Sequence, residues 1–378
     1  MGKTKILQVC HSYEPPFFDV ANQYAAVFDG SKYEVTCLFL KGKDSPMVRN
    51  QAIADKLLFL ESSTGDMRGM KAGLIKKLCR ILAEEHYSLV VAHRYKAIYL
   101  IGIASLISSP ILIVGVVHAY KVFSQLPRKL LVFLLRKRLK LLGVSESIRI
   151  DILDSLKTVS FNDVYSQPNC VEINRLQKEQ LPCDEARHKL DLDTKSFIIA
   201  TVGRMHPEKD QATLINAFCN ATLQMPKAKL YIYGAGPLKD ELKNLIVSLN
   251  LTDKVFLAGF VPEISRLFCA FDLFVLPSKI EPFGMVLIEA MSAKIPVLSS
   301  KSGGGVEILG NNNDLLFDIG DVEGLAAKLV YMYNLASGEQ KMHIDFAINR
   351  VETLFSQQAF NQNFWKLPFM QNILASGH

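Results

Sequence analysis

Residues 273–307 read LFVLPSKIEPFGMVLIEAMSAKIPVLSSKSGGGVE. The apolar run that ends at Pro277-Ser278 predicts a buried strand, and the segment that begins at Phe283-Gly284 has the apolar pattern of a helix. Pro296 begins a second apolar run, VLSS. A strand, a helix and another strand in this order are typical of a parallel sheet that is covered by helices.

The same alternation extends in both directions along the chain. It weakens between residues 151 and 180, and this interval predicts a boundary between two domains. We therefore expect an α/β protein with two doubly wound domains, residues 1–165 and 166–355, and a helical segment, 356–378, that crosses back to the N-terminal domain. Further apolar runs that predict strands lie at residues 5–10, 34–40, 88–93, 110–118, 139–145, 196–203, 229–234, 255–259 and 314–318.

Length and composition agree with two globular cores. The chain has 378 residues, of which 49% are hydrophobic and 21% charged. The longest apolar stretch, residues 97–118, is interrupted by serines and a proline, and it predicts a buried helix followed by a buried strand rather than a membrane span. The N-terminal apolar run breaks at Gln8 and His11, so no signal peptide is predicted, and seven cysteines without a CxxC pair indicate reduced thiols. These features favour a cytoplasmic protein.

Positive charge is concentrated in the N-terminal half. Residues 1–180 contain 25 Lys and Arg against 16 Asp and Glu, whereas the remainder contains 18 against 21. Cations interleaved with Leu, Val and Phe in residues 126–143 predict an amphipathic helix on an anionic membrane, although a solvated helix packed on its own sheet is the alternative. Too few aromatic residues lie there to indicate a nucleic-acid partner. The cations are Arg128, Lys129, Arg136, Lys137, Arg138 and Lys140.

Polar residues at strand ends in the second half predict a phosphate site. The run at 196–203 ends in Gly203-Arg204, and Lys209 follows just before an expected helix start. A planar guanidinium and a point charge beside a helix N-terminus suit a diphosphate, although two solvated loop cations would give the same pattern. The run at 229–234 leads into Gly234-Ala235-Gly236, which either lets the backbone approach a ligand or forms an ordinary tight turn.

Two carboxylates complete this pattern. Glu281 lies in the loop after strand 273–278, and Glu289 lies about five residues into the following helix, roughly 7 Å along its axis. A diphosphate at the amides of Gly284 and Met285 would bring a sugar near Glu281 and a ribose near Glu289. The alternative is an ordinary loop charge and an ordinary helix residue, but Glu289 lies among apolar neighbours, where a carboxylate requires a polar partner.

With these motifs the chain resembles the retaining glycosyltransferases of family 4, of the bacterial cell-surface glycan and lipopolysaccharide type. The resemblance implies the GT-B fold, in which two Rossmann-like domains face each other across a cleft. It is carried by VGRMHPEKD, YGAGPLKDEL, VFLAGFV, LFCAFDLFVLPS, the Glu-x7-Glu motif in EPFGMVLIEA, PVLSSKSGGGVE and LLFDIGDVEGLAAKL. In the N-terminal half, VVAHRYKA, VVHAY, GVSESIR and PNCVEI resemble the family's strand-end histidines, serine-containing strand end and interdomain link.

Three segments depart from the family pattern. The first loop, residues 11–23, reads HSYEPPFFDVANQ where the family has a glycine pair, so the way in which it holds acceptor or phosphate is open. Asn169-Cys170 in the link and Asn313-Asp314 before the last strand stand where the family has Asn-Gly.

The resemblance also implies roles for individual residues. Arg204 and Lys209 would neutralise the diphosphate leaving group, without an obligatory metal and without a cofactor. Glu281 would contact hydroxyls of the donor sugar, and Glu289 would hold the ribose. The donor-binding set is completed by Gly203, Gly234, Gly236, Phe283, Gly284 and Met285.

On the acceptor side, the resemblance places His118 near the anomeric carbon and the acceptor. A satisfied core histidine is the alternative. His11, His93 and Arg149 are acceptor-side candidates, with structural roles as the alternative. Ser145 either lines the cleft or caps a helix.

The implied reaction is transfer of a hexose from a nucleotide-sugar to a glycan with retention of configuration. We take a UDP-sugar as the donor, and lipopolysaccharide core or a lipid-linked saccharide at the inner face of the cytoplasmic membrane as the acceptor. Two rivals share the fold. A nucleotide-sugar 2-epimerase would consume donor without acceptor, and a non-catalytic binding protein would have lost the chemistry, which the intact Arg204, Lys209, Glu281 and Glu289 argue against.

Overall fold

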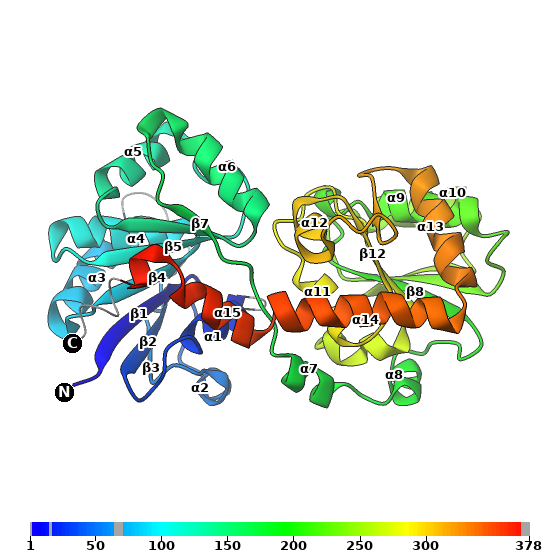
Figure 1. Ribbon diagram of the computed structural model, residues 1–378, viewed down its shortest axis with the longest axis horizontal. Helices are drawn as coiled ribbons and strands as arrows, with labels where there is room; N and C mark the ends of the chain where they lie inside the picture. Colours follow the sequence, from blue (N-terminus) through cyan, green and yellow to red (C-terminus); the bar gives the residue numbers. More distant parts are fainter. Residues whose placement is uncertain (1, 15–16, 64–70, 372–378) are drawn as a thin grey trace. The chain divides into compact units, whose positions relative to one another are not determined.

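The computed structural model describes residues 2–14, 17–63 and 71–371. The chain divides into two compact units: unit 1 is Met1–Asn169 with Phe360–His378, and unit 2 is Cys170–Ala359. The chain therefore passes from one unit to the other after Asn169 and returns after Ala359, four residues beyond each expected boundary. Each unit contains a parallel sheet with helices on its faces (Figure 1), which confirms the predicted fold class.

Unit 1 is built on a seven-stranded sheet of order β3-β2-β1-β4-β5-β6-β7, in which all neighbours are parallel. The central strands are almost wholly buried, as expected for apolar runs in a parallel sheet. Its strands are β1 Thr4–Cys10, β2 Tyr33–Phe39, β3 Lys56–Phe59, β4 Leu89–His93, β5 Leu112–Val117, β6 Leu139–Gly143 and β7 Val164–Ser166. Its helices are α1 Phe17–Ala25, α2 Pro46–Gln51, α3 Ala72–Glu85, α4 Arg94–Ile107, α5 Leu126–Leu135, α6 Glu146–Leu156 and the 3-10 turn η1 Lys157–Val159.

The sequence pattern does not predict the two edge strands, β3 and β7. They are only four and three residues long, too short to establish a periodicity. The side chains of β3 are half-buried or exposed, so this strand lacks the apolar run that marks the central ones. The other strands of unit 1 agree with the expected ones.

The C-terminal helix α15, Gln357–Trp365, begins in unit 2 and continues into unit 1. Within unit 1, Asn361 Nδ2 donates to Ala26 O at 3.3 Å and Trp365 Nε1 donates to Val27 O at 3.2 Å. The Phe28 ring meets the rings of Phe364 and Trp365 edge-on. Helix α15 is thereby fixed to the end of α1 and the residues that follow it.

The basic segment at residues 126–143 is not one helix. Helix α5 ends at Leu135, a turn follows, and Lys140 lies on β6. Two of the six cations therefore lie on the helix and three lie in the turn, so the predicted amphipathic helix is shorter than its charge pattern suggests. No helix in the described ranges is long and apolar enough to cross a membrane.

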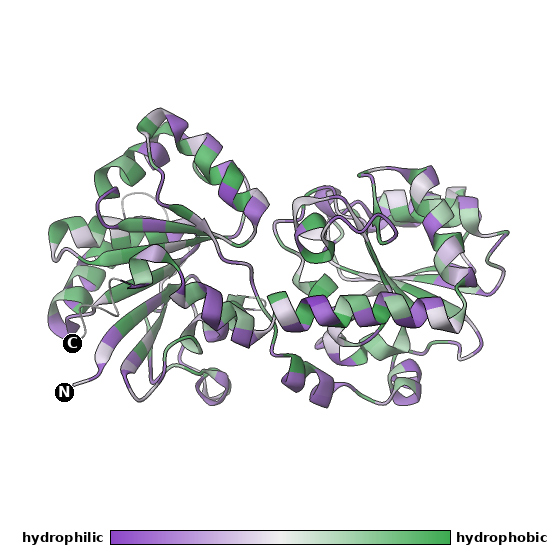
Figure 2. Cartoon of the chain, in the orientation of Figure 1, coloured by the Kyte–Doolittle hydropathy of each residue, from purple (hydrophilic) through white to green (hydrophobic). Residues whose placement is uncertain are grey.

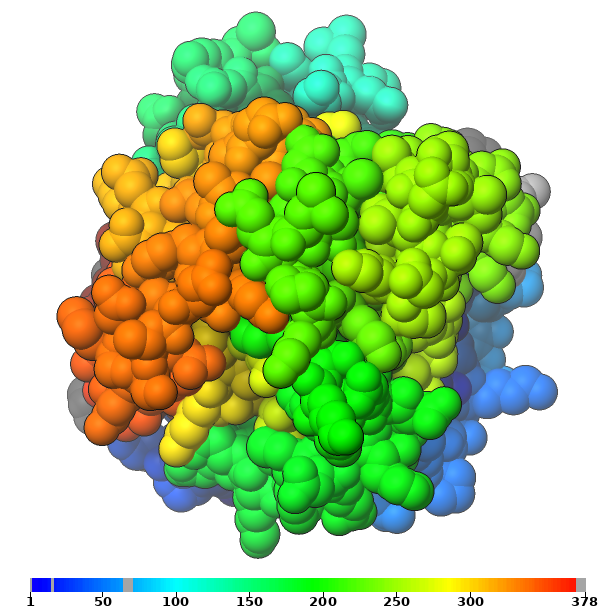
Figure 3. All heavy atoms as spheres, turned by 90° about the vertical axis from the view of Figure 1, so that its right-hand side faces the viewer, coloured from blue at the N-terminus to red at the C-terminus, as the bar shows by residue number. Residues whose placement is uncertain are grey.

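Unit 2 contains a six-stranded parallel sheet of order β10-β9-β8-β11-β12-β13. Helix α13 packs against α9, and the two helices lie side by side in Figure 3. The strands are β8 Phe197–Val202, β9 Ala228–Tyr233, β10 Val255–Gly259, β11 Leu273–Leu276, β12 Val297–Ser300 and β13 Leu316–Phe317. The helices are α7 Ile173–Glu179, α8 Cys183–Lys189, η2 Pro207–Lys209, α9 Gln211–Ala221, α10 Lys239–Ser248, η3 Ile264–Ala270, α11 Met285–Ser292, α12 Gly303–Leu309, α13 Val322–Asn334 and α14 Ser337–Leu354.

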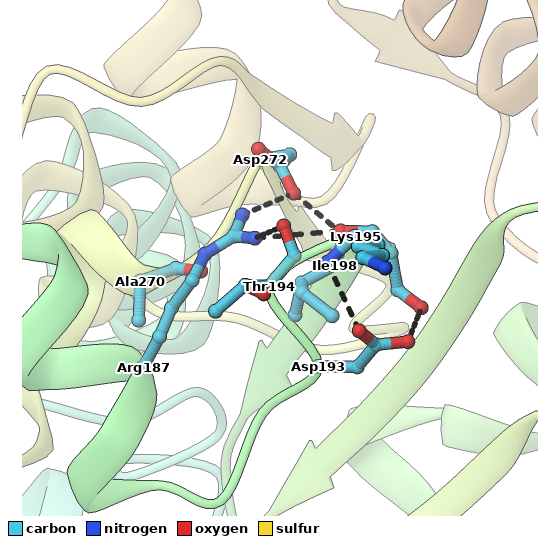
Figure 4. A network of polar contacts seen from close by, with 8 residues as sticks. Arg187, Asp193, Thr194, Lys195, Ile198, Ala270 and Asp272 are labelled. Carbon is cyan, nitrogen blue, oxygen red and sulfur yellow. Dashed lines mark hydrogen bonds and ion pairs between the residues drawn. The ribbon is translucent and has the colours of Figure 1, made fainter.

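Arg187 on α8 joins several segments at the amino ends of the unit 2 strands (Figure 4). Its Nη2 donates to Asp272 Oδ2 at 2.7 Å, and its Nε donates to Ala270 O at 3.1 Å. Asp272 Oδ2 also accepts from the backbone N–H of Ile198 at 2.7 Å. Because the Arg187 side chain is only 14% exposed, these charge-assisted bonds should contribute measurably to stability.

We predict that Arg187→Met lowers the free energy of unfolding by about 2 kcal/mol, because it leaves Asp272 and several carbonyl groups without their donor. Urea unfolding followed by circular dichroism measures the change. Arg175→Met is the matched control: Arg175 forms an exposed pair with Glu179, and its loss should cost less than about 0.5 kcal/mol. Equal effects of the two substitutions would contradict the role given to Arg187.

Candidate functional site

Most of the predicted donor residues of unit 2 lie in loops that leave the carboxyl ends of neighbouring strands, whereas Met285 and Glu289 lie on helix α11. Strands β9, β8, β11 and β12 are adjacent and parallel, so the loops after them meet at one edge of the sheet. This is the edge at which doubly wound sheets bind ligands.

The structure joins Lys209 to Glu281. Lys209 Nζ lies 2.6 Å from Glu281 Oε2, and the Glu281 side chain is 8% exposed. Ser278 Oγ donates to the same oxygen at 3.0 Å, and Ser300 Oγ donates to Ser278 O at 2.6 Å. Among the described residues, Glu281 Oε1 has no hydrogen-bond partner. From the sequence we predicted a phosphate contact for Lys209 and a sugar contact for Glu281. The ion pair between these two residues and the hydrogen bond from Ser278 to Glu281 were not predicted.

Further contacts join the same two loops. Lys279 Nζ lies 3.0 Å from Asp210 Oδ1, and the backbone N–H groups of Lys279 and Ile280 donate to Glu208 O at 2.8 and 3.2 Å. The Arg204 side chain, by contrast, is exposed and has no ion pair or hydrogen bond in the described part of the chain. Its backbone carbonyl accepts from Gln211 Nε2 at 2.9 Å, so the backbone at Arg204 is fixed while the guanidinium is available to a ligand.

Glycines allow the loops after β8 and β9 to pack backbone against backbone. A Cβ on Gly234 would lie 2.0 Å from Gly203 O, and a Cβ on Gly236 would lie 2.3 Å from Met205 O. Gly234 also has a φ of +132°, which residues with side chains rarely adopt. The packing of the two loops is thus enough to require glycines in this turn. This was the alternative to close approach of a ligand in the sequence analysis.

Helix α11 begins beside the Lys209–Glu281 pair. Gly284, with a φ of +107°, precedes its first residue, Met285, and the buried Phe283 packs edge-on against Phe355. The N–H of Gly304 donates to Glu281 O at 2.8 Å, and a Cβ at Gly304 would lie 1.9 Å from Phe283 O. Gly304 belongs to the quoted SKSGGGVE segment but had no predicted role. Glu289 is half-buried on the same helix.

In unit 1, the three candidate histidines lie at the carboxyl ends of neighbouring strands. His11 follows β1, His93 ends β4 and His118 follows β5, and these strands are adjacent in the sheet. The ring centroids of His93 and His118 are 6.0 Å apart. The sequence-based grouping of these residues at one strand edge therefore agrees with the topology.

Burial keeps His93 and His118 neutral. Gln8 Nε2 donates to Ala21 O at 2.9 Å, so Gln8 Oε1 accepts from His93 Nε2 at 2.9 Å and fixes the His93 tautomer. Burial, and then the nearby His118, hold the pKa of His93 well below its usual value. Burial and the charge of Arg94 lower the pKa of His118 to about 3. His118 Nε2 is buried without a hydrogen-bond partner among the described residues.

The remaining acceptor-side candidates have structural contacts. Arg149 forms an ion pair with Glu146 on the same helix, with Nη2 at 2.6 Å from Oε1. Ser145 is the N-cap of α6, and its Oγ accepts from Ile148 N at 3.3 Å. The Tyr13 ring in the atypical first loop packs edge-on against Phe39 at 5.6 Å. Residues 15–16 of that loop lie outside the described residues. No group of three or more metal-ligating side chains lies within the described ranges.

The chain is similar in sequence to known glycosyltransferases. Residues 183–346 match the family described as "Glycosyl transferases group 1". The chain is 33% identical over 141 residues to the lipopolysaccharide core biosynthesis glycosyltransferase LpsE of Rhizobium meliloti, a match that covers 37% of this chain and spans 40% of that relative. It is 27% identical over 265 residues to the UDP-Gal:alpha-D-GlcNAc-diphosphoundecaprenol alpha-1,3-galactosyltransferase of Escherichia coli, over 67% of this chain and 68% of the relative.

The whole fold has a solved counterpart. A glycosyltransferase from Rickettsia africae ESF-5 matches with a TM-score of 0.82 at 19% identity, and the match covers 99% of both chains. The predicted GT-B fold is thereby confirmed. The segment that matches the family contains Arg204, Lys209, Glu281 and Glu289. Residues 183–346 are therefore similar to the group 1 glycosyl transferases, in a chain that has the GT-B fold.

Proposed function

We propose that the protein is a retaining hexosyltransferase that works without an obligatory metal. Its donor is a nucleotide-sugar, most simply a UDP-sugar, as the name of the Escherichia coli relative suggests. Its acceptor is lipopolysaccharide core or a lipid-linked saccharide, in line with the names of both relatives. The observation that carries the proposal is the Lys209–Glu281 contact, together with an exposed Arg204 guanidinium that has no partner among the described residues.

The transfer breaks the bond between the anomeric carbon and the diphosphate and forms a bond from that carbon to an acceptor hydroxyl oxygen on the same face. The acceptor proton passes to the departing diphosphate. Negative charge grows on the leaving group, so fixed cations lower the barrier most. Arg204 and Lys209 supply this charge in place of a metal.

Glu281 has two parts in this scheme. Through Oε2 it holds Lys209 at 2.6 Å, so the ammonium does not have to be oriented during the reaction. Through Oε1 it can accept from hydroxyls of the donor sugar. The amides at the start of α11, at Gly284 and Met285, face the diphosphate, and Glu289 accepts from the ribose.

Membrane association rests on apolar residues as much as on charge. Leu126, Leu130, Phe133 and Leu134 form one stripe along α5, and they are 76%, 55%, 40% and 56% exposed. The opposite stripe of α5 is buried and contacts α4 and η1, and the helix is mostly green in Figure 2. An exposed apolar stripe on a helix is typical of proteins that insert shallowly into a lipid surface.

The cations around this stripe are unequal. Arg128 stacks on Tyr95 at 4.3 Å, Arg138 donates to Ser105 O, and Lys140 pairs with Asp163. These three are engaged within unit 1. We assign the headgroup contacts chiefly to Lys129, Arg136 and Lys137, of which Arg136 lies 4.2 Å from the Phe133 ring. We propose peripheral association with the inner face of the cytoplasmic membrane through this surface.

For catalysis, we predict that Arg204→Ala lowers turnover at least about 100-fold, because a lost charge-stabilising donor costs about 2.7 kcal/mol or more in the transition state. Release of the nucleoside diphosphate with an extracted glycolipid acceptor measures the rate. Lys195→Ala is a control that removes a cation from the amino edge of the same sheet. A rate near that of the wild type for Arg204→Ala would exclude the assignment.

For membrane binding, we predict that Leu130→Ser with Leu134→Ser weakens binding to anionic vesicles about tenfold or more, since each buried leucine contributes about 1.5–3 kcal/mol. Sedimentation with vesicles containing phosphatidylglycerol measures the bound fraction. Leu223→Ser is the control, because Leu223 is 92% exposed but lies in unit 2. Charge reversal at Arg136 and Lys137 should remove the salt-sensitive part of binding. Unchanged binding in both variants would refute the surface.

For pH dependence, we predict that titration of His118 does not affect kcat/KM between about pH 5 and 8, because its pKa of about 3 keeps it neutral there.

The free energy of unfolding, in contrast, should depend on pH through His118. The unfolded state takes up the proton near the ordinary pKa of 6.5, so stability is lost as the pH falls from 6.5 towards 3. Urea unfolding should show a slope of up to about 1.4 kcal/mol per pH unit from this group, reduced in His118→Asn. An identical slope in that variant would contradict the assignment.

A further inference from the structure

Three cations gather around His11 at the carboxyl edge of the unit 1 sheet. Lys41 follows β2, and its backbone N–H donates to His11 O at 2.9 Å. Arg94 and Lys96 follow β4, which pairs with β1 on the side opposite to β2. Positive charge therefore approaches His11 from both neighbouring strands.

Two of these cations have no carboxylate partner. In the described residues neither Arg94 nor Lys96 forms an ion pair or a hydrogen bond from its side chain, and both residues are exposed. The Arg94 guanidinium lies 4.4 Å from the ring centroid of Phe17. A cation–π contact of this kind orients the guanidinium but leaves its charge uncompensated.

The backbone at this position adds to the electrostatic cost. Arg94 is the first residue of α4, so its charge lies at the positive end of the helix dipole. Its φ of +69° is in the left-handed region, which is unfavourable for a residue with a side chain. Uncompensated positive charge at a helix N-terminus is a costly feature that the binding of an anion would offset. Strained backbone positions of this kind are found most often at ligand-binding and catalytic sites.

The positive charge of these residues also affects the pKa of His11. Burial, and then the charges of Lys96, Arg94 and Lys41, lower the pKa of His11 to about 4. His11 Nδ1 is buried without a partner among the described residues, and in the Nδ1–H tautomer it can donate to an anion. The site thus combines cations with one buried ring nitrogen that has no partner in the described part of unit 1.

We propose that Arg94 and Lys96, with Lys41 and His11 beside them, bind a phosphate group of the acceptor. A planar guanidinium next to point charges fits the charge and the several oxygens of a phosphate better than the single charge of a carboxylate. The substrate class is then a glycan carrying a phosphate monoester or a glycosyl diphosphate lipid. The assignment of this phosphate to the acceptor rests on the proposed function, whereas the prediction that these residues bind phosphate does not.

Inorganic phosphate and inorganic pyrophosphate are suitable probes, with the His11 ring resonances of the full chain as a local reporter. The His11 signal is identified by its loss in His11→Asn. We expect phosphate to raise the His11 pKa from about 4 towards its ordinary 6.5, because a bound anion offsets the surrounding cations. Arg94→Gln with Lys96→Gln should weaken the phosphate affinity about tenfold or more. Lys32→Gln, which removes an exposed cation near the amino edge of the same sheet, should leave it unchanged.

The variants also separate the two proposals. UDP affinity should be unchanged in Arg94→Gln with Lys96→Gln and reduced in Arg204→Ala. Phosphate binding that is equal in the wild type and the double variant, with thermal melting showing both folded, would overturn the acceptor site. So would a parallel loss of UDP affinity, because the cations would then serve the donor. Failure of UDP to bind any variant would overturn the donor assignment alone. Tighter pyrophosphate binding would support the diphosphate lipid, and equal affinities would support the monoester.

Discussion

The ion pair between Lys209 Nζ and Glu281 Oε2 is the contact on which the candidate donor site depends. It connects loops from the adjacent strands β8 and β11. The buried Ser278 donates a hydrogen bond to Glu281, and the buried Ser300 donates one to the backbone of Ser278. Because Glu281 already holds Lys209, a bound diphosphate shares this cation with a carboxylate instead of meeting an isolated ammonium. Arg204, which has no such partner in the described residues, is then the cation whose full charge a ligand receives. The two cations that look equivalent in sequence therefore differ in how much of their charge is compensated within the described residues.

Unit 1 differs from unit 2 in the partners of its strand-end cations. Its strand-edge cations Arg94 and Lys96 lack carboxylate partners among the described residues, and the histidines beside them are kept neutral by burial and by those same charges. Because its pKa of about 3 leaves His118 neutral at physiological pH, its ring can exchange hydrogen bonds with hydroxyl groups there. In the described residues, unit 2 thus has one strand-end cation paired with a carboxylate, Lys209, and one without a partner, Arg204, whereas neither Arg94 nor Lys96 of unit 1 has a carboxylate partner.

Much of the fold follows from sequence, because the central strands of parallel sheets are apolar runs long enough to recognise. The short edge strands β3 and β7 were missed, since three or four residues cannot show a period. At the site, strand-end positions located Arg204, Lys209 and Glu281, but their contacts depend on strand order. Lys209 and Glu281 are 72 residues apart, and only the β8–β11 pairing brings them together. Similarly, the charge pattern of residues 126–143 does not reveal that the helix ends at Leu135.

The close backbone contacts at Gly234, Gly236 and Gly304 limit how the donor site can change. A side chain at any of them would collide with a carbonyl oxygen, at 2.0, 2.3 and 1.9 Å respectively, so the loops would have to separate. Gly203 differs, because an added Cβ would meet only side-chain atoms of Lys209, at 3.7 Å or more. Engineering of donor preference, and divergence of donor preference within a lineage, would thus have to proceed through Gly203 and the side chains of the loops. The three tightly packed glycines form a sterically fixed frame around which such variation is possible.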